Sequence, residues 1–116
     1  MKFLMTYRQA PSAPPPTPDQ MAALGKFTED NVQSGVVVMT GGMIRPTKGT
    51  KVALAGGSFT VTDGPFAETK ELIDGFAIVN VTSKEHALEV AQSFMRVAGD
   101  GEGEILQIFE GGEGHH

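Results

Sequence analysis

Five side chains have types and positions that suit the binding or chemical conversion of a small molecule: Tyr7, Arg45, Asp63, Glu68 and Lys70. Glu68 could accept a proton, and Lys70 could hold an anion, if both lined one pocket. Tyr7 ends an expected strand and could donate a proton or a hydrogen bond. The alternative interpretations are a solvated charged turn for Glu68 and Lys70, and packing of Tyr7 at a dimer face with its hydroxyl in water.

A small basic cluster follows Gly41-Gly42 and consists of Arg45, Lys48 and Lys51. It could bind a carboxylate, or it could be a solvated loop. It lacks the spacing of a phosphate-binding P-loop, and no dinucleotide-binding glycine motif occurs elsewhere. The chain has no cysteine, which excludes zinc–thiolate sites and thiol nucleophiles. We therefore predict no metal site and no cofactor.

The composition is that of one small domain. The chain has 116 residues, and we expect residues 1–110 to form a single domain and residues 111–116 a flexible tail. The net charge of −5 argues against nucleic acid as a main partner, because contact with phosphates needs a basic face. No window approaches the roughly 18 apolar residues of a membrane span. The predicted location is cytoplasmic.

Hydrophobic periodicity predicts a β-α-β unit, a hairpin and a second β-α-β unit. Thr17 and Pro18 indicate the start of the first helix, with Gln20 in position for a capping box, and Thr82 or Ser83 indicates the start of the second. Asp63-Gly64-Pro65 is expected to end the hairpin. The predicted strands lie at residues 3–8, 36–40, 51–54, 58–62, 75–81 and 105–109, and the helices at residues 18–34 and 83–98.

This order predicts an α+β fold of the ferredoxin-like, split-βαβ type, with an antiparallel sheet and two helices on one face. Residues 36–40 form a β-branched run that we interpret as a central strand buried on both faces. Several strands carry apolar residues on both sides, so the face without helices needs a cover. A second copy packed face to face would bury it, which predicts a homodimer with the form of a dimeric α+β barrel.

One run in the middle of the chain is distinctive: Thr62-Asp63-Gly64-Pro65-Phe66-Ala67-Glu68-Thr69-Lys70-Glu71. It resembles the signature of the DGPF branch of the YCII-related family, and the resemblance covers most of the chain. The resemblance implies the same dimeric α+β barrel, with a small-molecule pocket near the signature turn. Asp63 can also fix that turn by accepting backbone N–H bonds.

The chain departs from one family pattern. Some YCII proteins are expected to use a His–Asp pair, with the histidine on the first helix, for acid–base catalysis. The first helix here has no histidine, and His86 lies on the second helix, away from its apolar stripe. That mechanism therefore does not transfer residue by residue, and proton transfer would have to use carboxylates or Tyr7.

Three functional hypotheses stay open at this point. The family resemblance implies a small-molecule enzyme related to lyases, isomerases or dehydrochlorinases, or a binding module that uses the same pocket without catalysis. It also implies an accessory role beside alternative sigma factors, since DGPF proteins are often encoded next to them. The acidic composition and the lack of a DNA-reading helix give this third hypothesis no independent support.

Overall fold

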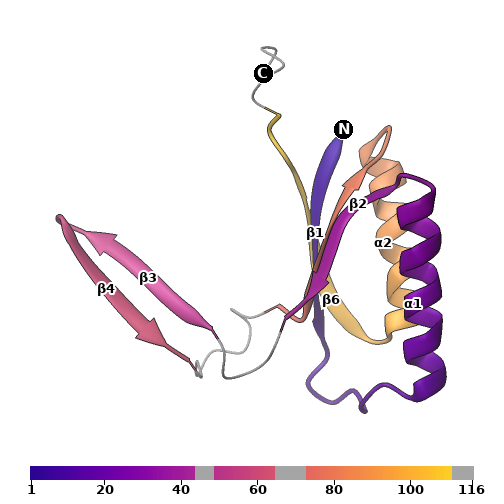
Figure 1. Ribbon diagram of the computed structural model, residues 1–116, viewed down its shortest axis with the longest axis horizontal. Coiled ribbons are helices and arrows are strands. Elements are labelled where there is room, and N and C mark those ends of the chain that lie inside the picture. Colours follow the sequence, from indigo (N-terminus) through magenta and orange to yellow (C-terminus); the bar gives the residue numbers. More distant parts are fainter. Residues whose placement is uncertain (44–48, 65–72, 111–116) are drawn as a thin grey trace.

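The computed structural model describes residues 1–43, 49–64 and 73–110 of the chain. A four-stranded antiparallel sheet in the order β2-β5-β1-β6 carries both helices on one face, and the hairpin β3-β4 stands apart from it (Figure 1). This confirms the α+β, ferredoxin-like prediction. The elements are β1 (Lys2–Gln9), α1 (Pro18–Gln33), β2 (Val37–Gly42), β3 (Thr50–Ala55), β4 (Ser58–Asp63), β5 (Gly75–Asn80), α2 (Lys84–Ala98) and β6 (Gly101–Gln107).

Both helices begin where the sequence predicts. The Thr17 side chain accepts a hydrogen bond from the backbone N–H of Gln20 at 3.1 Å, and Pro18 occupies the first helical turn of α1. Ser83 caps α2 by accepting from the backbone N–H of His86 at 3.0 Å. These bonds satisfy N–H groups that have no partner inside the helix.

The prediction that residues 36–40 form a central, doubly buried strand is wrong, because β2 is an edge strand that pairs with β5. Val37 is buried, but Val38 and Met39 are 56% and 57% exposed, and the register shifts between Val37 and Met39. β1 and β5 take the two central positions in the split-βαβ connection. The β-branched composition of the run therefore reflects strand propensity and not a central position.

The last strand begins earlier than predicted, at Gly101 instead of Ile105. Glycines usually weaken strands, so the sequence placed the start of this strand after Gly101 and Gly103. A Cβ atom on Gly101 would lie 2.5 Å from the carbonyl oxygen of Arg8 and 2.7 Å from the ring of Tyr7. The absence of a side chain on Gly101 therefore allows β6 to pair with β1 beneath the tyrosine.

The core between the sheet and the helices is thin. Among the described residues, the buried apolar side chains are Phe3, Met5, Val37, Val79, Val81, Ala87 and Ala98. None of them comes from α1, where the apolar residues Met21 and Val32 are 61% and 50% exposed. α1 therefore contributes through the half-buried Leu24 and Phe27.

The other face of the sheet is apolar and uncovered within the described chain. Phe3 and Met5 point to the helices, so the alternating residue Leu4 points the opposite way. Leu4 is paired with Ile78 on one side and with Leu106 on the other. We call these three residues, together with Met39, the open face. Leu106 is 51% exposed, so one end of the open face is in contact with solvent.

In the described parts of the chain, neither helix has the length and apolar character needed to cross a membrane.

The glycine argument can be tested with a matched pair of substitutions. We expect Gly101→Ala to lower the free energy of unfolding by about 1–3 kcal/mol, because the new methyl group overlaps backbone and ring atoms. Gly25→Ala should raise the free energy of unfolding by roughly 0.5–1 kcal/mol, because alanine favours a helix more than glycine does. The new methyl group has room, since no neighbouring atom outside the helix backbone lies within 4 Å of its position. Urea unfolding followed by circular dichroism measures both, and equal effects would contradict the close approach of β6 to β1.

Candidate functional site

A cavity of about 650 Å³ lies between the two helices and the covered face of the sheet. Its wall is mainly apolar and includes three aromatic rings that contact one another in sequence. Phe94 meets Tyr7 edge-on, with ring centroids 5.2 Å apart, and meets Phe27 with centroids 6.2 Å apart. The helix and strand residues that complete the apolar part of the wall include Met5, Leu24, Val37, Ala77, Val79, Ala91, Met95 and Ile105.

Tyr7 is tied to the end of α2. Its hydroxyl lies 2.8 Å from the carbonyl oxygen of Gly99 and 3.1 Å from that of Asp100, so its proton is donated to backbone carbonyls. These carbonyls follow the last helical turn and would otherwise lack a partner within the helix. The interpretation with the hydroxyl in water is therefore not what the structure shows. The phenol oxygen can still accept a hydrogen bond from a ligand.

Burial raises the pKa of the Tyr7 phenol above its ordinary value of 10.0, and the negative charges of Asp74 and Asp100 raise it further. The phenol therefore stays protonated at neutral pH. It can orient a ligand, but it cannot serve as a general base under those conditions.

Asp74 marks the polar end of the cavity. Its Oδ2 atom accepts a hydrogen bond from the backbone N–H of Gln9 at 2.6 Å, and its own N–H donates to the carbonyl oxygen of Tyr7 at 2.7 Å. Its carbonyl oxygen accepts from Met43 at 2.8 Å. These bonds fix the Asp74 backbone and carboxylate where β1 and β2 end and β5 begins.

The structure places the five sequence-predicted site residues differently. Tyr7 lines the cavity. Asp63 is exposed at the base of the hairpin, where its Oδ1 atom accepts a hydrogen bond from the Thr50 hydroxyl at 2.8 Å, and it does not line the cavity. Arg45, Glu68 and Lys70 lie outside the described residues.

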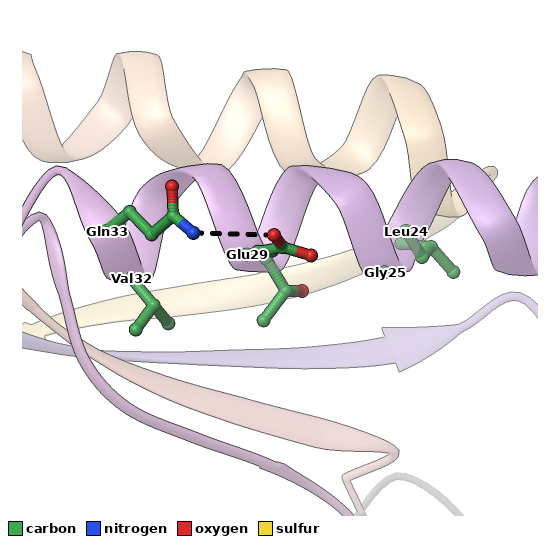
Figure 2. Close-up of a pocket in the computed structure, with 6 residues that line it drawn as sticks. Leu24, Gly25, Glu29, Val32 and Gln33 are labelled. Atoms are coloured by element: carbon green, nitrogen blue, oxygen red, sulfur yellow. Dashed lines mark hydrogen bonds between the residues drawn. The ribbon is translucent and has the colours of Figure 1, made fainter.

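Two further hollows are less suited to a small ligand. One runs along α1, and Figure 2 shows that all its labelled residues belong to that helix, with Gln33 and Glu29 joined by a hydrogen bond of 3.4 Å. It is a surface depression with little to enclose a ligand. The other lies beside the end of α2 and includes the ion pair of Arg8 with Glu102. The cavity under the helices combines more apolar surface with better enclosure, as small-molecule sites usually do.

The comparison of sequences adds the family to this fold and cavity. The model of the YCII-related domain matches residues 1–110. The chain belongs to the YCII-related family. A comparison with curated proteins gave no match. This YCII-related chain therefore has a secure family and fold, and its site has to be argued from its own residues.

Sequence reasoning missed Asp74 as a site residue. The residue stands directly before the Gly75 that begins β5, and a carboxylate at a strand start is a signal that could have found it. Phe27 and Phe94 lie on the apolar sides of the two helices. The periodicity gave the correct side of each helix for these two residues, but it could not reveal that they border a cavity.

The single tyrosine and the absence of tryptophan make Tyr7 directly observable. We expect the near-ultraviolet absorbance of the folded protein to show phenol ionisation at a pH above 10.0, and that of the protein in denaturant to show it near 10.0. Because the folded state holds this proton more tightly, the stabilisation is present below pH 10 and is lost as the pH rises through the folded pKa. A folded midpoint at or below 10.0 would contradict the burial of the phenol.

Proposed function

We propose that this YCII-related protein binds a small, mainly apolar molecule in the cavity between its helices and its sheet. The observation that supports the proposal is the connected row of Tyr7, Phe94 and Phe27 along a cavity whose volume falls in the range of ligand sites. Aromatic rings pack favourably edge-to-face, so such a wall suits a flat or aromatic ligand.

The polar end of the cavity favours one class of substituent. Asp74 presents a carboxylate there, and the Tyr7 oxygen is an acceptor because its proton is donated to the Gly99 and Asp100 carbonyls. A carboxylate and a phenol oxygen can each accept more than one hydrogen bond, so both suit a ligand that brings a hydrogen-bond donor. We therefore infer a ligand that carries a hydroxyl or amino group on an apolar body.

The position of the cavity also supports the sequence prediction of a pocket near the signature turn. Asp74 and Gly75 line the cavity and stand shortly after Glu71, the last residue of the signature run. Glu68 and Lys70, within that run, remain our candidates for proton transfer and anion binding. The DGPF branch and the accessory role beside sigma factors stay predictions from the sequence resemblance alone.

Ligand binding can be tested with a cavity-filling substitution. Phenols and aromatic alcohols such as 4-ethylphenol should raise the melting temperature of the wild-type protein, because a ligand that binds the folded state stabilises it. Ala91→Leu, which adds three carbon atoms at the cavity wall, should weaken the affinity by about tenfold or more through lost space. Isothermal titration calorimetry measures the dissociation constants.

Ala23→Leu is the matched control, because it makes the same change at an exposed α1 position that does not line the cavity. It should leave the affinity unchanged. Ethylbenzene should bind more weakly than 4-ethylphenol if Asp74 and Tyr7 receive the donor. A panel without a binder, or equal binding by Ala91→Leu and the wild type, would overturn the proposal.

We further propose that the open face is the contact of a homodimer. The apolar residues of this face line up across three neighbouring strands, with Leu4 paired to Ile78 and to Leu106. The exposed Met39 extends the surface onto the edge strand β2. A second copy buries the same residues by two-fold symmetry, so one patch serves both sides of the interface.

Light scattering should therefore show a dimer at micromolar concentration. Leu106→Lys should convert it to a monomer, because it places a charge within an apolar contact. Gln107→Lys provides the control for the added charge, because this exposed residue follows Leu106 on the same strand and points to the opposite face of the sheet. A wild-type protein that is monomeric at these concentrations would exclude the dimer.

A further inference from the structure

We propose that the β3-β4 hairpin is an arm that grips the second copy of the chain, with its apolar side against that copy. This inference rests on the homodimer proposed above and adds a second contact to it. The hairpin is a separate two-stranded sheet, and all of its residues from Thr50 to Asp63 outside the turn are exposed.

The two sides of the hairpin differ in character. The register pairs Val52 with Val61 and Leu54 with Phe59, and these residues share one side because side chains alternate along a strand. They are 61–71% exposed. The opposite side carries the polar residues Lys51, Ser58, Thr60 and Thr62 together with two alanines.

This alternation is the pattern of a strand pair that covers an apolar partner. A single two-stranded hairpin is at best marginally stable in water. Its turn is well formed, since Gly56 and Gly57 both have positive φ angles of 56° and 82°, as a tight hairpin turn requires. We therefore expect the exposed apolar side of this hairpin to pack against another protein surface.

The area favours a second copy as that cover. The four apolar hairpin side chains expose on the order of 300–400 Å² of apolar surface, at or above the size at which exposed patches usually mark an interaction site. The open face offers limited exposed area, because two of its four residues, Leu4 and Ile78, are half-buried. A stable interface needs about 800 Å² from each partner, so the open face requires a second patch of this size.

The position of the hairpin also favours a second copy of the chain as its cover. Figure 1 shows the helices on one side of the sheet and the hairpin projecting from the other side, away from the body. A copy packed on the open face would occupy the space beside the hairpin. The two-fold symmetry of such a dimer places one arm against each copy, so that both arms are covered at once.

Sedimentation of a matched pair of variants tests the arm. Phe59 and Thr60 are neighbours on β4 with side chains on opposite sides, and both are exposed. Phe59→Lys should raise the dissociation constant of the dimer by about tenfold or more, whereas Thr60→Lys should change it less than about twofold. Val61→Thr, which keeps the shape and strand propensity of the side chain, should weaken the dimer in the same direction.

The result also separates this inference from the homodimer itself. If Leu106→Lys dissociates the dimer and Phe59→Lys does not, the arm is overturned and the open-face dimer stands. If the wild type is a monomer, both proposals fall. Loss of dimerisation in Phe59→Lys and Val61→Thr, with a normal Thr60→Lys, supports the arm.

Hydrogen–deuterium exchange gives an independent readout that does not require hairpin variants to fold. The amides of residues 50–63 should exchange slowly in the wild-type dimer and rapidly in the Leu106→Lys monomer. Equally rapid exchange in both would overturn the arm. Equal protection in both would show that the hairpin packs against its own chain, and that result would also overturn it.

Discussion

The carbonyl groups at the end of α2 are the point on which the arrangement of the other elements depends. A helix leaves its last carbonyls without partners, and leaving them unpaired is costly when they are partly buried. In this chain the partners come from distant segments. The Gln20 side chain of α1 donates to the carbonyls of Val97 and Ala98 at 3.1 and 2.8 Å, and the Tyr7 hydroxyl of β1 donates to the residues that follow. One helix end thereby fixes the positions of a strand and of the other helix.

These polar ties explain how α1 is held although it has no fully buried residue. The hydrogen bonds of Gln20 at one end of α1 and the half-buried Leu24 and Phe27 replace a continuous row of buried apolar residues. Burial normally supplies most of the stability of an amphipathic helix, so this attachment leaves space under α1. The cavity is the direct consequence, and the same tie that holds Tyr7 also sets the polar character of the cavity end.

A thin core has a second consequence. A chain of 116 residues has little apolar area to spare, and here much of it lies outside the covered layer, on the open face and on one side of the hairpin. The free energy of folding is a small difference between large terms, so such surfaces influence whether the chain is stable alone. Association between copies would bury both surfaces, and it would couple the stability of the fold to its assembly.

The sequence by itself determined the elements, their order and the fold class, because periodicity, caps and glycine turns act over a few residues. The Thr17 and Ser83 caps and the hairpin at residues 51–62 were all found this way. The tertiary structure decided the rest. Residues 36–40 lie at the edge of the sheet, and β6 begins at Gly101, because strand order and close approach depend on residues far away in the chain. Of the candidate site, the sequence identified Tyr7. Its link to α2 and the place of Asp74 beside the cavity depended on contacts between distant segments, which no local pattern encodes.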